Sequence, residues 1–344
     1  MTKLRFKIVA LATLMCAGAA QAQGSGDGKA GLDGPHLGLH HAAMTVSDID
    51  ATIAFYSKAV PYKAVRRFKV KGSVFPAALL SRPYKQVEIA IIAMSTGFIQ
   101  LMDFEPGKTG VANPRPVIGP GYTHICFQSA SKDPAIFRFM AAGLSIISRF
   151  DAKDGVDLGG YGVRYSYGRD PDGIMIENES LDAPKRREAA WITHIANVVH
   201  DRDKMLEFYT RLLGRKAHRT TEQENNSKLD AVGGLYNSKI KGGWFTVGNM
   251  DIEVWEFARP KTPLRSGRQK LDEIGYNSFG LEVTDLKAEK RRLKAQKIPL
   301  VGGTVSLDGW RVQYGVDPEG NLFSVQENLS SDQSLSVMGL PKNS

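Results

Sequence analysis

Two patterns of apolar residues follow each other along the chain. In one, apolar and polar residues alternate, as in a β-strand; in the other, apolar residues recur every three or four positions, as in an amphipathic helix. The stretch LHHAAMTVSDIDATIAFYSKAV, residues 39–60, shows both patterns in turn, which predicts a strand, a polar turn and an amphipathic helix. Ser47 or Asp48 stands where the helix needs an N-cap. The β-rich segments AALLSR, VEIAIIAM and FIQLMDF follow, so this first unit has the predicted order βαβββ.

The same order recurs three more times along the chain. The second, third and fourth units begin at YTHICFQSA, WITHIANVV and YNSFGLEVT. The turns RDPDG and VDPEG precede the last strands of the second and fourth units. His41 and His194 are separated by the same number of positions as Phe55 and Phe208, so the two halves of the chain repeat each other.

Paired βαβββ units with this opening motif and a DPDG or DPEG turn resemble the vicinal oxygen chelate superfamily, which includes glyoxalase I, bleomycin-resistance proteins and extradiol dioxygenases. The resemblance implies an α+β fold with two tandem glyoxalase-type modules, each a cupped, mixed and curved sheet with a metal at its base. The first module is then expected at residues 37–180 and a second, degenerate module at residues 191–328. Residues 181–190 form the linker between them, and residues 329–344 form a C-terminal tail.

The resemblance places metal ligands on the first and last strands of each unit. In chain order these positions hold His41, Gln100, His124, Glu177, His194, Glu253, Ser278 and Ser324. Two imidazoles and a carboxylate with open coordination positions suit a catalytic divalent ion. The expected cofactor is therefore one divalent metal ion, with Zn, Ni, Mn and Fe(II) all open.

Two pairings of the units are compatible with these positions. If the first two units share a sheet, the site consists of His41, Gln100, His124 and Glu177. This uncrossed pairing is favoured because neighbouring units usually pack together. If the units are crossed, as in fused glyoxalases, the second and third units share a sheet and the site consists of His124, Glu177, His194 and Glu253. In both pairings, Ser278 and Ser324 of the fourth unit belong to the other cup, which lacks a complete set of metal ligands.

Strand periodicity also predicts the neighbours of these ligands. Met102, Met175 and Cys126 fall on the same strand faces as Gln100, Glu177 and His124, which predicts that they line the pocket. Cys126 is alternatively a small core residue. The same alternation puts His40 on the face opposite His41, where it packs against the helix or faces solvent.

The resemblance implies metal-stabilised enolate chemistry on a small oxygenated organic substrate, catalysed by an isomerase, epimerase or lyase. Glu177 is the expected ligand and candidate base. One alternative is an Fe(II) ring-cleavage dioxygenase of the extradiol type, in which Tyr167, on the same face as Glu177, serves as the acid. Thr109 and Leu158 stand near the places where such enzymes carry further histidines, which argues against this reading. A second alternative is a non-catalytic ligand-binding protein of the bleomycin-resistance type.

The first 22 residues combine Lys3, Arg5 and Lys7 with the apolar run IVALATLMCAGAA and an A-x-A site, which predicts a signal peptide and a secreted or periplasmic protein. Residues 23–36 then form a flexible segment. Cleavage removes Cys16 and leaves Cys126 alone, so no intrachain disulfide is expected.

The formal net charge of the chain is +9, but basic and acidic residues are mixed along it, which argues against binding to nucleic acid. The expected partner is a small molecule, with no membrane span after cleavage and a monomer or homodimer as the assembly.

Overall fold

The computed structural model describes residues 34–341, apart from residue 63 and the segments 106–114 and 150–153. The expected signal peptide and Cys16 lie outside the described residues, as do Thr109 and most of the expected flexible segment 23–36. None of the described helices has the length and apolar character needed to cross a membrane.

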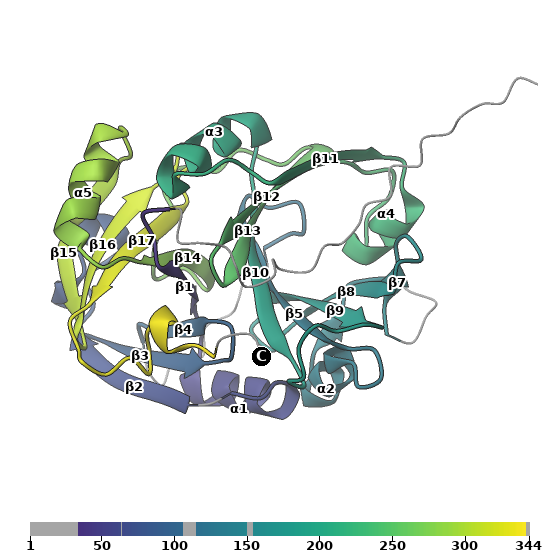
Figure 1. Ribbon diagram of the computed structural model, residues 1–344, viewed down its shortest axis with the longest axis horizontal. Helices are drawn as coiled ribbons and strands as arrows, with labels where there is room; N and C mark the ends of the chain where they lie inside the picture. Colours follow the sequence, from purple (N-terminus) through teal and green to yellow (C-terminus); the bar gives the residue numbers. More distant parts are fainter. Residues whose placement is uncertain (1–33, 63, 106–114, 150–153, 342–344) are drawn as a thin grey trace, which may run out of the picture.

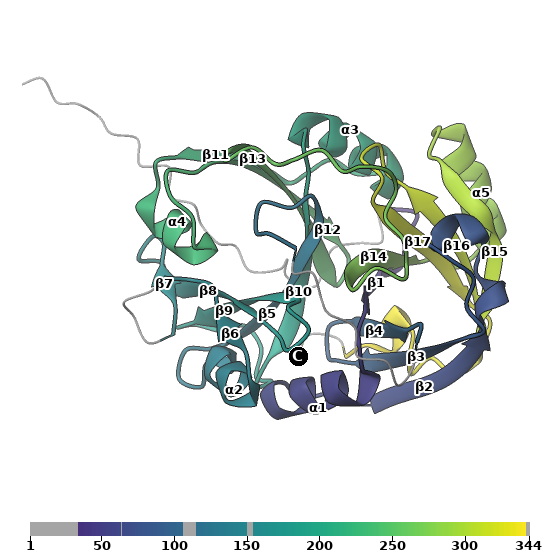
Figure 2. The same ribbon diagram turned by 180° about the vertical axis from the view of Figure 1, so that it is seen from behind.

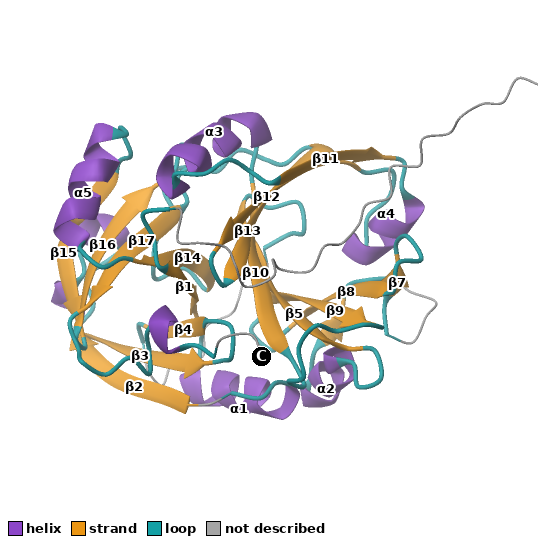
Figure 3. Cartoon of the chain, viewed as in Figure 1, coloured by secondary structure: helices purple, strands orange, loops and turns teal. Residues whose placement is uncertain are grey.

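The predicted α+β fold with four βαβββ units is confirmed (Figure 3). Unit 1 contains β1 (Gly38–Thr45), α1 (Ile49–Ala59), β2 (Ala64–Lys71), the 3₁₀ turns η1 (Gly72–Val74) and η2 (Ala77–Leu79), β3 (Gln86–Ala93) and β4 (Phe98–Asp103). Unit 2 contains β5 (Gly121–Ala130), α2 (Ala135–Ala142), β6 (Ser145–Ile146), β7 (Val156–Asp157), β8 (Val163–Arg169) and β9 (Met175–Leu181). The segment AALLSR was expected as a strand and instead begins with η2, because β2 supplies the edge strand of this unit.

The second half of the chain repeats this plan. Unit 3 contains β10 (Trp191–Val198), α3 (Arg202–Leu213), β11 (Arg219–Glu224), α4 (Ser227–Gly233), β12 (Lys239–Val247) and β13 (Met250–Arg259). Unit 4 contains β14 (Gly275–Glu282), α5 (Leu286–Ala295), β15 (Leu300–Leu307), β16 (Trp310–Val316) and β17 (Leu322–Asn328), and η3 (Val337–Gly339) follows in the tail. Asp48, Asp201 and Asp285 cap α1, α3 and α5, each accepting a hydrogen bond from the backbone N–H three residues later.

The units are crossed between two sheets, so the expected uncrossed pairing is wrong. Sheet A has the order β15-β16-β17-β14-β1-β4-β3-β2 and joins units 4 and 1. Sheet B has the order β11-β12-β13-β10-β5-β9-β8-β6 and joins units 3 and 2. Figure 1 shows the two sheets side by side, with each half of the chain contributing to both, and Figure 2 shows the same arrangement from behind.

The lengths of the connections explain the crossing. Units 2 and 3 are joined by residues 182–190, whereas units 1 and 2 are joined by the longer stretch 104–120. The shorter connection keeps its two units in one sheet, and the longer one passes from sheet A to sheet B. The expected modules at residues 37–180 and 191–328 are therefore not the two sheets, because each sheet takes one unit from each half.

The two concave faces differ in what fills them. The helix-facing sides of both sheets form one continuous core that includes Phe127, Tyr209 and Phe279. The concave face of sheet A, cup A, is filled by apolar side chains, and Leu335 and Val337 of the tail pack onto them. The concave face of sheet B, cup B, instead carries a row of buried polar and charged side chains, which is described below.

One β-bulge recurs in the first strand of every unit. The paired registers of β1 with β14 and of β10 with β5 each skip one residue per strand. The skipped residues are His40, Thr123, Thr193 and Asn277. Each side chain hydrogen-bonds to the side chain of the next residue, which is the predicted ligand position of that strand.

The bulge also corrects the expectation for His40. Its side chain lies on the same side of sheet A as His41, with the two Nδ1 atoms 2.8 Å apart. The imidazole stacks on Phe98, and the ring centroids are 4.5 Å apart. Regular alternation predicted the opposite face, and the extra residue of the bulge cancels that alternation locally.

Candidate metal centre

Four buried side chains meet at the centre of cup B. His124, Glu177, His194 and Glu253 come from β5, β9, β10 and β13, which are neighbours in sheet B. One potential ligand atom from each lies within 4.8 Å of all the others. Glu177 Oε2 is 2.8 Å from His194 Nε2 and 3.3 Å from His124 Nε2, and Glu253 Oε2 is 3.3 Å from His194 Nε2. This is the crossed set predicted from the sequence.

The chemistry of these donors fits a divalent ion. His124 Nε2 is buried and makes no hydrogen bond with the described residues, although Glu177 Oε2 is nearby. The Nδ1 atoms of His124 and His194 contact the hydroxyls of Thr123 and Thr193 at 3.1 and 3.2 Å, so both rings present Nε2 to the centre. Ligand atoms bound at about 2.0–2.2 Å to one ion lie about 3 Å from one another, as the contacting pairs do here. The residues therefore fit a metal ion with two imidazole and two carboxylate ligands.

The charges of Glu177 and His194 stabilise each other. Burial opposes the charge of Glu177, but the interactions of its carboxylate with His124 and His194 outweigh burial and hold its pKa far below the ordinary value. Burial likewise opposes the charge of His194, but the carboxylates of Glu253 and Glu177 outweigh it and raise its pKa to about 10. Both carboxylates thus favour a positive charge at the centre of the cup, either a proton on His194 or a bound cation.

The two carboxylates are held differently. The indole N–H groups of Trp244 and Trp255 donate to Oε1 and Oε2 of Glu253, the second at 2.8 Å. Glu177 contacts the two histidines through Oε2, and its Oε1 makes no hydrogen bond with the described part of the chain. Glu253 is therefore fixed, whereas Glu177 has an oxygen available for substrate. Neither tryptophan was predicted from the sequence, although Trp255 lies two residues from Glu253 on the same strand and Trp244 is the cross-strand partner of Glu253.

Tyr167 lies beside the four ligands, as its position in the sequence predicted. It is the cross-strand partner of Glu177, and its ring centroid is 4.9 Å from that of His124. Burial and the charge of Glu177 raise the pKa of the Tyr167 phenol well above its ordinary value. The phenol therefore stays protonated and is suited to donate a hydrogen bond or a proton.

A second polar cluster extends the site along the cup. Cys126, Glu179, Glu177 and His194 also bring ligand atoms within 4.8 Å of one another. Burial raises the pKa of the Cys126 thiol well above its ordinary value. Burial and the nearby Glu177 raise the pKa of Glu179 to about 7, and Gln128 donates to this carboxyl group at 2.5 Å. Glu179 was not predicted from the sequence, although strand alternation puts it on the face of Glu177.

The remaining predicted pocket residues are divided between the sheets. Met175 is buried in sheet B and is the strand partner of His124. Met102 lies in sheet A, where it belongs to the apolar filling of cup A. The prediction that Met102 and Met175 line one pocket is therefore wrong, because it depended on the uncrossed pairing.

The uncrossed ligand set is not assembled. His41 and Gln100 lie on β1 and β4 of sheet A, with Ser278 and Ser324 on β14 and β17 of the same sheet. Burial lowers the pKa of His41 well below its ordinary value, so its imidazole is neutral. Among the described residues, no group of three potential ligands includes His41. Cup A therefore lacks the donors that a tight metal site requires.

In the metal-free protein, the free energy of unfolding is expected to fall as the pH rises from 6.5 towards 10, because folding raises the pKa of His194. Its ordinary value is 6.5 and its folded value about 10, so the stabilisation is complete below pH 6.5 and is lost towards pH 10. Glu179 changes stability in the same direction at lower pH, because folding raises its pKa from 4.5 to about 7. Its stabilising contribution is complete below pH 4.5 and is lost towards pH 7. Urea unfolding with a chelator present measures how the free energy of unfolding depends on pH. The His194→Gln variant should show little of the decrease between pH 6.5 and 10. An unfolding free energy that stays constant or rises with pH in the wild type contradicts the expectation.

Comparisons with known proteins agree with this architecture. Two family models described as the glyoxalase/bleomycin resistance protein/dioxygenase superfamily match residues 38–178 and 193–314. Glyoxalase I from Zea mays has a similar structure, with 16% identity, a TM-score of 0.57, and coverage of 84% of this chain and 92% of that chain. A putative dioxygenase from Bacillus subtilis has 12% identity, a TM-score of 0.55, and coverage of 89% and 91%.

These structural likenesses concern the fold alone at such low identities. Comparison with curated protein sequences finds no match. The two family models nevertheless cover most of the chain, one in each half. The chain therefore belongs to the glyoxalase/bleomycin resistance protein/dioxygenase superfamily, with two glyoxalase-type domains built from four βαβββ units.

Proposed function

We propose that the protein is a metal-dependent isomerase, epimerase or lyase that removes a proton from a carbon beside an oxygen-bearing carbon of a small organic substrate. The observation that carries this proposal is the convergence of two imidazoles and two carboxylates in cup B. A divalent ion bound by His124, Glu177, His194 and Glu253 would polarise the substrate oxygens and favour the enolate.

The side chains of the cup supply the proton transfers. Glu177 is ionised and has Oε1 available, so it takes the proton from the substrate carbon and returns it to the same or the adjacent carbon. Glu253 stays in place because both of its oxygens are held by indole N–H groups. Tyr167 is protonated and lies within the cup, so it donates to the substrate oxygen on which negative charge develops.

We further propose that this chemistry takes place outside the cytoplasm, since residues 1–22 have the composition of a signal peptide. A free organic acid, ketone or aromatic compound is then a more suitable substrate than a coenzyme A thioester or a glutathione adduct.

Deuterium exchange tests the proposal directly. The protein is loaded in turn with Zn, Ni, Mn or Fe(II), and hydroxy and keto acids are incubated with it in heavy water. Exchange at the carbon beside the oxygenated carbon is expected in proton NMR spectra. Glu177→Gln should slow the exchange by about 100-fold or more, the usual contribution of a general base. Exchange that proceeds equally well in Glu177→Gln contradicts the assigned base, and the absence of exchange with every metal contradicts the reaction class.

A ring-cleavage dioxygenase is the second candidate, and the position of Tyr167 beside His124 favours it. Such an enzyme binds iron through two histidines and one carboxylate, and the set of this kind within the uncrossed ligands, His41, His124 and Glu177, is not assembled. His124, His194 and one of the two glutamates provide an equivalent set, but the second carboxylate leaves fewer open positions for substrate and oxygen. Oxygen uptake with catechols and Fe(II) would identify this activity. A protein that only binds its ligand would show neither uptake nor exchange.

A further inference from the structure

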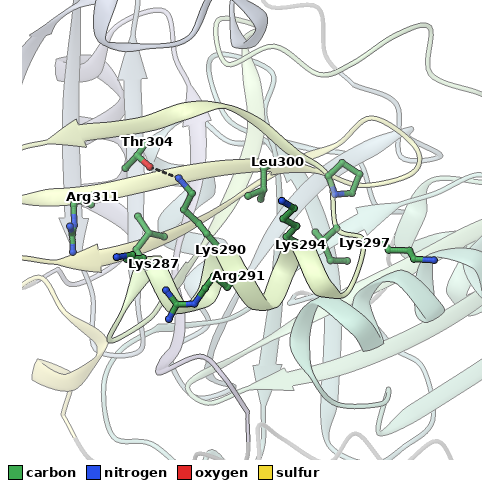
Figure 4. A pocket seen from close by; sticks show the side chains of 11 residues that line it. Lys287, Lys290, Arg291, Lys294, Lys297, Leu300, Thr304 and Arg311 are labelled. Atoms are coloured by element: carbon green, nitrogen blue, oxygen red, sulfur yellow. Dashed lines mark hydrogen bonds between the residues drawn. The ribbon is translucent and has the colours of Figure 1, made fainter.

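A second concave site lies on the far side of sheet A, between α5 and the outer surface of β15 and β16. Its volume is about 810 Å³, and Figure 4 shows the side chains that line it. The basic members of the lining are Lys287, Lys290, Arg291, Lys294, Lys297 and Arg311. The described lining contains no acidic side chain. We call this site the α5 groove.

The spacing of the basic residues on α5 gathers them on one face. Lys287, Lys290, Arg291 and Lys294 follow the i, i+3, i+4 and i+7 positions that share one side of a helix. The acidic residue of α5, Glu289, is turned away and is bonded to Arg292 and His36. Lys290 donates to the hydroxyl of Thr304 at 2.8 Å. No described carboxylate forms an ion pair with these four cations, whereas Arg311 on the opposite wall of the groove is paired with Glu327 of β17.

The equivalent places in units 1 and 3 are built with opposite charges. In unit 1, Arg67 of β2 bonds to Asp50 of α1 and to Glu88 of β3, both at 2.5 Å. In unit 3, Arg202 of α3 bonds to Glu222 of β11 at 3.1 Å. An ion pair thus joins the helix to its outer strands in these two units. In unit 4 the same place carries cations on α5 and no described acidic partner for them.

The base of the α5 groove is apolar. Leu286 and Ile298 are buried, and Leu300 is half-buried. A flat membrane surface cannot reach side chains at the base of a concavity, whereas a free molecule can enter it. The volume lies within the range of about 300–1,000 Å³ that is usual for small-molecule sites.

We propose that the α5 groove binds a small amphiphilic anion. Its apolar body lies on Leu286, Ile298 and Leu300, and its carboxylate, phosphate or sulfate group is held by Lys290, Lys294 and their basic neighbours. The site belongs to unit 4 of sheet A and is separate from the metal centre in sheet B, as the positions of α5 and β10 in Figure 1 show. The inference therefore does not depend on the proposed function.

Calorimetric titration with decanoate tests the proposal. The wild type is expected to bind one equivalent, and the double variant Lys290→Ala/Lys294→Ala should bind about tenfold more weakly, because two charge contacts are lost. Leu300→Ser should also weaken binding, since it removes apolar contact. The matched control is Lys204→Ala/Lys228→Ala, which removes two exposed lysines from α3 and α4 and should leave the affinity unchanged. Circular dichroism confirms that each variant is folded.

The comparison ligands distinguish the remaining sources of binding. The methyl ester of decanoate and inorganic phosphate should each bind more weakly than decanoate, because each lacks one of the two features. Affinity for the ester equal to that for decanoate overturns the proposal, and so does unchanged decanoate affinity in the Lys290→Ala/Lys294→Ala variant. Binding to phosphatidylglycerol vesicles without binding to decanoate overturns it in favour of a membrane surface.

Discussion

Replacement of His194 by alanine is expected to abolish tight binding of a divalent ion, whereas replacement of His41 by alanine should leave it intact. His194 Nε2 contacts both Glu177 and Glu253, so its loss removes an imidazole ligand and leaves two carboxylates without their central partner. The loss in affinity should exceed about 100-fold, the upper cost of disturbing only the residues around a metal ligand. Metal analysis of protein loaded with Zn or Ni, together with calorimetric titration, measures both the stoichiometry and the affinity.

The His41→Ala variant is a matched control, because both residues occupy the same position of a repeated strand. His41 lies in sheet A and His194 in sheet B. Among the described residues, His41 belongs to no group of potential metal ligands. Loss of the ion from His41→Ala would point to the uncrossed set of ligands. Retention of one tightly bound equivalent by His194→Ala would contradict the centre in cup B.

Replacement of Phe279 by alanine is expected to lower the free energy of unfolding by about 3–5 kcal/mol, the usual cost of removing a buried phenyl ring. Phe279 is fully buried on β14, where three units meet. Its ring centroid lies 5.8 Å from Tyr122 of unit 2 and 6.2 Å from both Tyr209 of unit 3 and Phe323 of unit 4. The cavity therefore opens in the core shared by both sheets. Urea unfolding followed by circular dichroism measures the effect.

The control for this variant is Phe137→Ala on α2, because the side chain of Phe137 is 42% exposed. Its effect should stay within about 0.5 kcal/mol, as for most surface substitutions. Equal losses from the two variants would show that Phe279 does not join the sheets in the way its contacts indicate. Coincident unfolding curves from fluorescence and circular dichroism verify that the sheets unfold together.

The repeated pattern was sufficient to predict the units and the ligand positions within them. Strand alternation put Glu177 and Tyr167 on one face, and the matched spacing of the halves aligned His41 with His194 and Gln100 with Glu253. These predictions depend on local geometry, which the order of apolar and polar residues determines. The structure assembles the crossed set, one of the two that the sequence left open.

The pairing of units could not be read from the same local pattern. Unit 2 has a chain neighbour on each side, and the preference for neighbours applies equally to units 1 and 3. Only the difference between the connections at 104–120 and 182–190 distinguishes them. His40 was misplaced for a related reason, since a bulge depends on the partner strand and leaves no trace in the alternation of its own strand.

The residues around the ligands were missed because they become neighbours only through strand pairing. Trp244 reaches Glu253 across β12 and β13, and Gln128 reaches Glu179 across β5 and β9. Thr123 and Thr193 were not predicted either, although the sequence carries a signal for them. The shared dipeptide Thr-His in YTHICF and WITHIA marks the hydroxyl that orients each imidazole.

The crossed arrangement has a consequence for the evolution of the duplicated chain. The candidate metal centre takes His124 and Glu177 from the first half and His194 and Glu253 from the second. Duplication therefore gives no redundancy, because damage to either half disables the same single centre. An ion bound there would also link the halves, since its binding free energy would add to the stability of the folded chain. Selection on cup B thus acts on both copies together, while cup A remains free to lose its ligands.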